Sequence, residues 1–158
     1  MSRGRAGAAA ALALAALLPG VAQAQSVLDC DRWQANARNL MLPPAAHSRS
    51  YANDQVHLLG LDTGEPACCS VYLMVLWPAS EGEYLECALI AREGELGFAF
   101  AEIAQTAAGY DPATGLRLEV PVTIYLPEAS FTNSGIVGLT VNRATATVTA
   151  DFTPGPNE

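Results

Sequence analysis

Two stretches in the second half of the chain alternate between apolar and mostly polar residues, and this period of two constrains the fold more than any other feature. In residues 116–125 every even position from Leu116 to Ile124 is apolar, and the odd positions carry Arg, Glu, Pro, Thr and Tyr. Residues 144–152 repeat the pattern with Ala, Val and Phe against Thr and Asp. A period of two places the apolar side chains on one face of a strand. The sequence therefore predicts a mainly β protein with half-buried strands.

Turn signals separate the chain into a series of such runs. They are Glu81-Gly82, Glu93-Gly94 and the segment YDPATG at residues 110–115. The runs cover residues 55–61, 67–77, 83–92, 95–107 and 116–125, followed by two final strands. The apolar phase slips near Asn142-Arg143, so a turn or bulge is expected there. Successive hairpins form an antiparallel meander, and the runs predict a sandwich or small barrel of about seven strands.

Residues 26–42 have a different period. Apolar residues recur there at steps of three and four, among them Cys30, Trp33 and Ala37, and the proline pair that starts at Pro43 follows. This pattern predicts one N-terminal helix over residues 26–42, with Cys30 on its apolar stripe. We expect a single disulfide-stapled β domain over residues 25–152, and a disordered tail over residues 153–158.

The first residues are typical of an export signal. Arg3 and Arg5 precede an apolar stretch over residues 6–18, and Ala22 and Ala24 frame a small-residue cleavage site. The apolar stretch is shorter than the roughly 20 residues that span a bilayer. The sequence therefore predicts a signal peptide over residues 1–24 and no integral membrane segment after cleavage. The expected location is the bacterial periplasm or the exterior of the cell.

The charge balance excludes one class of partner. The formal net charge is −8, the chain has no lysine, and loss of Arg3 and Arg5 with the signal peptide would change the charge to −10. Nucleic-acid affinity depends on cationic contacts with phosphates. An acidic chain with so few cations predicts a protein or small-molecule partner, which the sequence does not identify, and no nucleic acid.

Four cysteines, Cys30, Cys68, Cys69 and Cys87, lie after the expected cleavage site. An even count in an exported chain favours two disulfides, and the Cys-x-x-Cys spacing of a metal site is absent, so we expect neither metal nor cofactor. A bond between the adjacent pair needs an eight-membered ring, which a regular strand does not accommodate. The expected pairings are therefore Cys30–Cys68 with Cys69–Cys87, or Cys30–Cys69 with Cys68–Cys87, and the residues leave both open.

The tripeptide Asp62-Thr63-Gly64 follows the apolar run HLLGL. This stretch resembles the active-site loop of retropepsin-like aspartic peptidases, and GIVGL at residues 135–139 is similar to a later supporting element of that family. The resemblance implies a dimer in which Asp62 of each chain shares one proton. The residues alone favour a polar turn in which Asp62 accepts hydrogen bonds from nearby backbone N–H groups.

The sequence thus offers two hypotheses about function. The first is an exported, non-catalytic domain with a binding or envelope-structural role, and no residue is then assigned to catalysis. The alternative is a dimeric aspartic peptidase that uses Asp62, Thr63 and Gly64.

Overall fold

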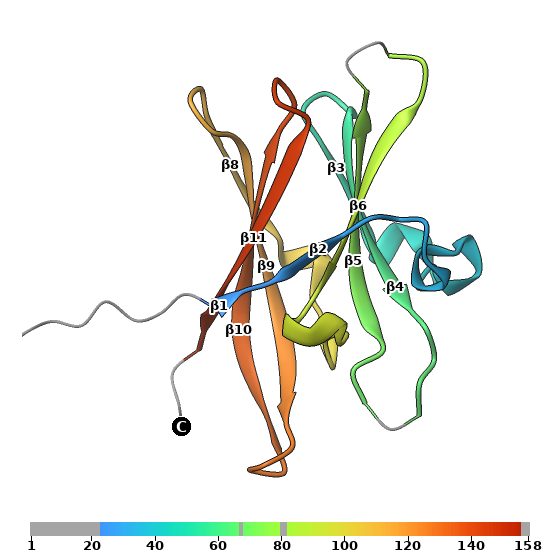
Figure 1. Cartoon of the computed structure of the whole chain (residues 1–158), viewed down its shortest axis with the longest axis vertical. Coiled ribbons are helices and arrows are strands. Elements are labelled where there is room, and N and C mark those ends of the chain that lie inside the picture. Colours follow the sequence, from blue (N-terminus) through green and yellow to red (C-terminus); the bar gives the residue numbers. More distant parts are fainter. Residues whose placement is uncertain (1–22, 67, 80–81, 156–158) are drawn as a thin grey trace, which may run out of the picture.

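The computed structural model describes residues 23–66, 68–79 and 82–155. Most of the expected signal peptide and the last three residues of the expected tail lie outside this part of the chain. Within it, two antiparallel sheets face each other (Figure 1). The six-stranded sheet comprises β1 (Gln23–Ala24), β7 (Phe100–Ala101), β8 (Ala107–Asp111), β9 (Gly115–Leu126), β10 (Phe131–Asn142) and β11 (Thr147–Pro154). The five-stranded sheet comprises β2 (Ser26–Leu28), β3 (Ser48–Tyr51), β4 (Val56–Asp62), β5 (Val71–Pro78) and β6 (Leu85–Ala91).

The order of the strands follows the chain over much of each sheet. The six-stranded sheet has the order β1-β11-β10-β9-β7, and β8 also pairs with β9. The five-stranded sheet has the order β2-β6-β5-β4-β3. The hairpin β5–β6 places Leu76 opposite Cys87.

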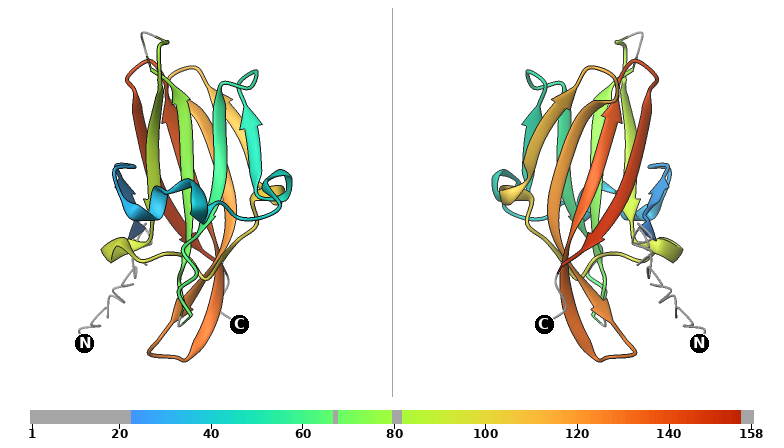
Figure 2. Two further views of the ribbon diagram at one scale, coloured as in Figure 1. Left: turned by 90° about the vertical axis from the view of Figure 1, so that its right-hand side faces the viewer. Right: turned by 90° about the vertical axis from the view of Figure 1, so that its left-hand side faces the viewer.

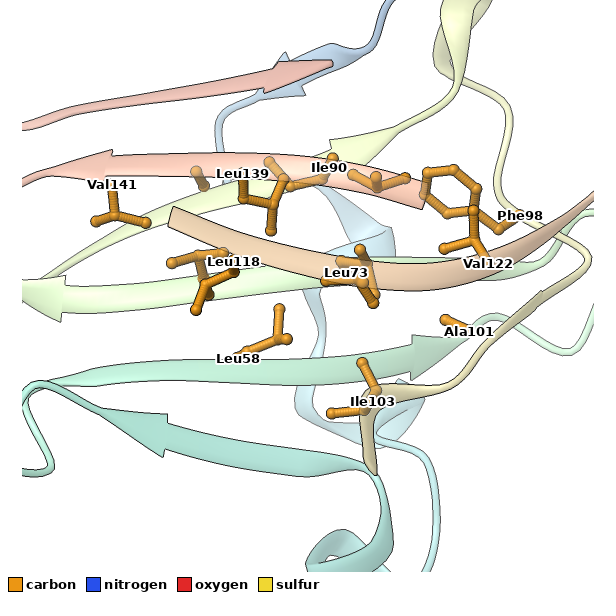
Figure 3. Close-up of a cluster of buried hydrophobic side chains, with 14 of the residues drawn as sticks. Leu58, Leu73, Ile90, Phe98, Ala101, Ile103, Leu118, Val122, Leu139 and Val141 are labelled. Atoms are coloured by element: carbon orange, nitrogen blue, oxygen red, sulfur yellow. The ribbon is translucent and has the colours of Figure 1, made fainter. Parts of the chain in front are cut away.

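Alternate side chains of both sheets meet in one core (Figure 3). The six-stranded sheet contributes Leu118 and Leu139, and the five-stranded sheet contributes Leu58, Leu73 and Ile90, all of them with no exposed surface. Burial of such a side chain stabilises the folded state by about 1.5–3 kcal/mol. The prediction of a mainly β protein is confirmed. The apolar phase slip is also confirmed as a turn, since residues 143–146 connect β10 to β11.

The expected strand over residues 95–107 is wrong. The chain instead forms the 3-10 helix η4 (Glu93–Glu95), the two-residue strand β7 and the 3-10 helix η5 (Ile103–Gln105). This segment leaves the five-stranded sheet after β6 and joins the six-stranded one, so the expected meander is interrupted. The physical reason is that its buried residues, Phe98, Ala101 and Ile103, do not share one spacing of two.

A single helix over residues 26–42 is not present either. Residues 26–28 form β2, and the short 3-10 helices η1 (Trp33–Ala35) and η2 (Ala37–Asn39) follow, before a third, η3 (Pro44–Ala46). The buried Asn39 explains part of this, because its Nδ2 donates to the carbonyls of Trp33 (2.9 Å) and Gln34 (3.0 Å). Asparagine side chains that bond to nearby backbone groups compete with helix formation. None of the helices in the described ranges is long and apolar enough to cross a bilayer.

The N-terminal segment covers the outer face of the five-stranded sheet (Figure 2). Leu28, Cys30 and Leu40 pack there against a second, smaller group of buried residues that includes Leu61 and Leu89. The apolar spacing that suggested a helix therefore reports a real buried face. It is the backbone conformation that differs.

Both expected sets of disulfide pairings are wrong. Cys30 is bonded to Cys87, and Cys68 is bonded to Cys69. The first bond follows from the pairing of β2 with β6, because extending the register of Leu28 opposite Leu89 by two residues brings Cys30 opposite Cys87. The second is accommodated because β5 begins only at Val71, so the adjacent cysteines lie in the preceding loop. Cys69 has a φ of +70° there, which no regular strand residue adopts.

We predict that the Cys30–Cys87 bond contributes strongly to the free energy of unfolding. It joins residues 57 positions apart, and closing a loop of that size stabilises the folded state by about 4 kcal/mol in the chain-entropy model. We expect the double variant Cys30→Ser/Cys87→Ser to lose about that much free energy of unfolding in urea titrations. The matched control is Cys68→Ser/Cys69→Ser, which opens no long loop and should lose less than about 1 kcal/mol. Equal losses in the two double variants would contradict this account.

Candidate functional site

Asp62 lies at the end of β4, where the chain turns towards β5. Its Oδ1 accepts a hydrogen bond from the backbone N–H of Gly64 (2.8 Å), and Gly64 has a φ of +73°. A glycine adopts this left-handed conformation without the steric cost of a Cβ atom. The predicted polar turn is confirmed, and Asp62 is exposed on it.

The second stretch of the peptidase resemblance lies in the other sheet. Residues 135–139 belong to β10, where Val137 faces the core and Gly138 faces outward. Asp62 is on β4 of the five-stranded sheet. The structure thus does not bring the two stretches together within one chain.

Gly138 has a different local role. Arg117 of β9 reaches across β10 to form a bidentate ion pair with Asp151 of β11, with distances of 2.6 Å and 3.0 Å. A Cβ atom at Gly138 would lie 1.8 Å from the Arg117 guanidinium, so only glycine leaves this path free. The hydrogen bond to Asp151 raises the pKa of Arg117 further above its already high value. The charge of Arg117 is therefore paired with that of Asp151 within the protein.

The Cys68–Cys69 pair lies in the same connection as Asp62. Backbone hydrogen bonds hold it on both sides: Thr63 N–H donates to the Ser70 carbonyl (3.0 Å), and Val71 exchanges two hydrogen bonds with Phe98 (3.0 Å and 2.6 Å). Gly97 passes so close that a Cβ atom there would lie 2.1 Å from the Cys69 carbonyl oxygen. We call the pair and its flanking residues, 62–66 and 68–71, the disulfide turn.

A groove lies at the opposite end of β4. Three turns converge there at the upper end of Figure 1: the β3–β4 turn of one sheet, and the β8–β9 and β10–β11 turns of the other. The volume of the groove is about 190 Å³. Its lining residues are Ala52, Val56, Tyr110, Pro112, Ala113, Gly115, Leu116, Val141, Asn142, Arg143 and Ala144. The floor is apolar because Val56, Leu116 and Val141 are the ends of core-facing rows.

Two side chains at this groove are chemically distinctive. Tyr110 has 75% of its surface exposed, which is unusual for an aromatic residue in a small domain. Arg143 is also exposed, and its Nη1 donates a hydrogen bond to the neutral Oε1 of Gln55. Arg32 and Arg117 form ion pairs with carboxylates, whereas Arg143, like Arg38, Arg49 and Arg92, has no such pair within the described residues. The groove therefore combines an aromatic face with a cation that forms no ion pair with a carboxylate in the described residues.

Neither Tyr110 nor Arg143 was predicted from the sequence to be a functional residue. A signal was present, since Tyr110 begins the YDPATG turn and Arg143 stands at the phase slip. In consecutive antiparallel strands, every second turn lies at the same end of the sheet. The two turns could have been placed together on that basis, whereas the nearness of the β3–β4 turn required the packing of the two sheets.

A second hollow lies on the six-stranded sheet. It has a volume of about 370 Å³ and is lined mainly by Pro121, Thr123, Ser134 and Ile136, with Glu102 as the ionisable residue. This hollow is open and receives residues from β9, β10 and the neighbouring segments only. It lacks the convergence of turns from both sheets that marks the groove.

The chain matches no protein-family model, no curated protein and no solved structure. In the described part of the chain, no three or more His, Cys, Asp or Glu side chains gather in a group that could hold a metal ion. The groove and the disulfide turn are therefore the two candidate functional sites.

The close approach at Gly97 leads to a prediction about stability. A methyl group at Gly97 must displace the Cys69 carbonyl and with it the two hydrogen bonds between Val71 and Phe98. We expect Gly97→Ala to lower the free energy of unfolding by about 2–4 kcal/mol in urea titrations.

Gly109 offers a matched control for this variant. A Cβ atom at Gly109 meets no atom within 4 Å, so Gly109→Ala should change the free energy of unfolding by less than about 1 kcal/mol. Similar losses for the two variants would show that Gly97 is not held against Cys69 in solution.

Proposed function

We propose that this chain is an exported, non-catalytic β-sandwich that binds a small molecule in the groove formed by the β3–β4, β8–β9 and β10–β11 turns. The observation that carries the proposal is the position of Arg143 and Tyr110 on the rim of an apolar groove to which both sheets contribute. Binding sites are commonly concave and apolar, with a few polar groups that orient the ligand. Turns at one end of a two-sheet domain are also a frequent place for such sites.

The size of the groove limits the ligand. A cavity of about 150 Å³ accepts benzene, so a groove of about 190 Å³ suits a molecule with a single ring. An aromatic or other flat apolar ring can lie against Tyr110. A carboxylate or phosphate on that ring can accept hydrogen bonds from the guanidinium of Arg143.

The acidic character of the whole chain does not oppose such a ligand strongly. Interactions between exposed charges are largely screened beyond about 8 Å at physiological ionic strength. The lining of the groove contains no Asp, Glu or His residue. Asp54 and Asp111 belong to the same turns, so an anionic ligand must lie closer to Arg143 than to these two carboxylates. The lining itself lacks the pair of titratable groups that acid–base catalysis uses. For that reason we propose binding rather than catalysis.

Export supports this assignment from a second direction. Two disulfides are typical of proteins in oxidising compartments, and the first 24 residues have the pattern of a signal peptide. Cleavage after Ala24 would remove β1, which pairs with Phe152 and Asp151 of β11. The groove would remain, since none of its lining residues precedes Ala52.

The binding proposal predicts a specific titration. We expect benzoate to shift the amide signals of residues 110–116 and 141–144 in ¹H–¹⁵N correlation spectra of the protein that lacks residues 1–24. Arg143→Gln should weaken benzoate binding about tenfold, because it removes a charge-assisted hydrogen bond. The matched control is Arg38→Gln, the same change of charge at an exposed arginine on η2, which should leave the affinity unchanged. Equal affinities of Arg143→Gln and the wild-type protein, or shifts outside the groove, would overturn the proposal.

The export proposal predicts the mass of the mature protein. Expressed with its own N-terminus in a bacterium that has a periplasm, the protein should be recovered from that compartment beginning at Gln25. Replacing Ala22 and Ala24 by Leu should block cleavage, since signal peptidases require small residues at those two positions. Intact mass spectrometry distinguishes the forms. A cytoplasmic protein that retains residues 1–24 would contradict export.

A further inference from the structure

We propose that the Cys68–Cys69 bond is a thiol–disulfide exchange site, and that its substrate is an external dithiol. This activity is separate from the proposed binding function. The disulfide turn lies at one end of β4 and the groove at the other, since Asp62 ends the strand and Val56 begins it. The two proposals can therefore fail independently.

The two disulfides differ in how strongly the folded state favours them. Cys30–Cys87 anchors the N-terminal segment over the outer face of the five-stranded sheet and links residues 57 positions apart. The folded state therefore favours that bond strongly, and reducing it costs fold stability. Cys68–Cys69 joins neighbours in sequence, so its bond restricts no long loop of the unfolded chain. Folding thus gives the adjacent pair little protection against reduction.

The backbone at Cys69 adopts a conformation that the Cys68–Cys69 bond helps to maintain. Its φ of +70° lies in the left-handed region, which is strained for a residue with a Cβ atom. The bond to Cys68 and the close contact with Gly97 hold Cys69 in that conformation. Opening the ring removes one of these two constraints. The reduced turn therefore has more conformational freedom than the oxidised turn.

Backbone hydrogen bonds hold the turn in place independently of the Cys68–Cys69 bond. Thr63 and Ser70 are hydrogen-bonded across the base of the turn, and Val71 is bonded to Phe98. These bonds lie outside the ring and fasten the turn to β4 and to the segment that leads into β7. The protein can thus lose the Cys68–Cys69 bond and keep its fold. Both cysteines are also partly exposed, which gives an external thiol access.

The exchange proceeds in two balanced steps. A thiolate of the external dithiol attacks the Sγ of one cysteine and forms a mixed disulfide, while the electron pair of the broken bond leaves with the Sγ of the other. The second thiol of the reagent then attacks the mixed disulfide, so the reagent becomes a disulfide and both cysteines become thiols. The two protons come from the reagent. A monothiol is a poor substrate, because the released thiolate is on the adjacent residue and closes the ring again.

The test is a reduction titration of the folded, full-length mature protein with dithiothreitol, followed by alkylation and peptide mass mapping. We expect Cys68 and Cys69 to be alkylated together at a dithiothreitol concentration at least about tenfold below the one that exposes Cys30 and Cys87. The far-ultraviolet circular dichroism should stay unchanged at that point. After treatment with glutathione at an equal concentration of thiol groups, the pair should be alkylated much less.

Three outcomes would overturn the proposal. They are simultaneous alkylation of all four cysteines, alkylation of Cys68 and Cys69 only after the circular dichroism signal is lost, and equal reduction by glutathione. A second measurement locates the effect. In ¹H–¹⁵N correlation spectra, reduction should shift residues 62–71 and 96–98 and leave Tyr110 and Arg143 unchanged. Shifts that spread through both sheets would show that the bond supports the fold and is not a local exchange site.

Discussion

Burial of alternate side chains between two facing sheets is the constraint on which the rest of the structure depends. Leu118 and Leu139 from one sheet meet Leu73 and Ile90 from the other, and each is wholly buried. Because a strand has two faces, this burial fixes which residues of β9, β10 and β11 point outward. It also fixes the two ends of the sheets, where the turns must lie. The groove and the disulfide turn occupy opposite ends for that reason.

A second layer completes the five-stranded sheet. Its outer face presents Leu61, Tyr72 and Leu89, and the N-terminal segment covers them. Burial raises the pKa of the Tyr72 hydroxyl, which donates to the Glu95 carbonyl (3.4 Å). The Cys30–Cys87 bond holds the segment in place covalently. The N-terminal segment thus covers this face of the sheet with short 3-10 helices and a disulfide bond, where other folds use a longer amphipathic helix.

Periodic burial explains which elements could be predicted from the sequence. The strict alternation of residues 116–125 and 144–152 predicted β9 and β11, and the phase slip at Asn142-Arg143 predicted the turn before β11. Residues 92–106 could not be predicted in this way, because their buried side chains follow the crossing from one sheet to the other and have no constant spacing. In residues 26–42, the spacing correctly indicated a buried face, but Asn39 and the pairing of β2 decided the backbone.

The candidate sites illustrate the same limit. Asp62 was predicted to accept a local backbone hydrogen bond, and it does. The disulfide pairings were wrong because the strand that follows Cys69 was expected to include it. Thr63 and Ser70 pair before β5 begins, which leaves the adjacent cysteines outside the regular ladder. Tyr110 and Arg143 line a groove only because turns of both sheets meet. The spacing of apolar residues within one strand does not indicate which parts of two sheets contact each other.

The covalent map decides most directly between this account and its alternatives. A non-reducing peptide map of the exported protein should yield one cross-linked peptide pair that joins Cys30 to Cys87, and one peptide that contains an internal bond between Cys68 and Cys69. That result would support both the anchored N-terminal segment and the separate disulfide turn. A peptide that joins Cys30 or Cys87 to Cys68 or Cys69 would contradict the register of β2 on β6, and the exchange site with it.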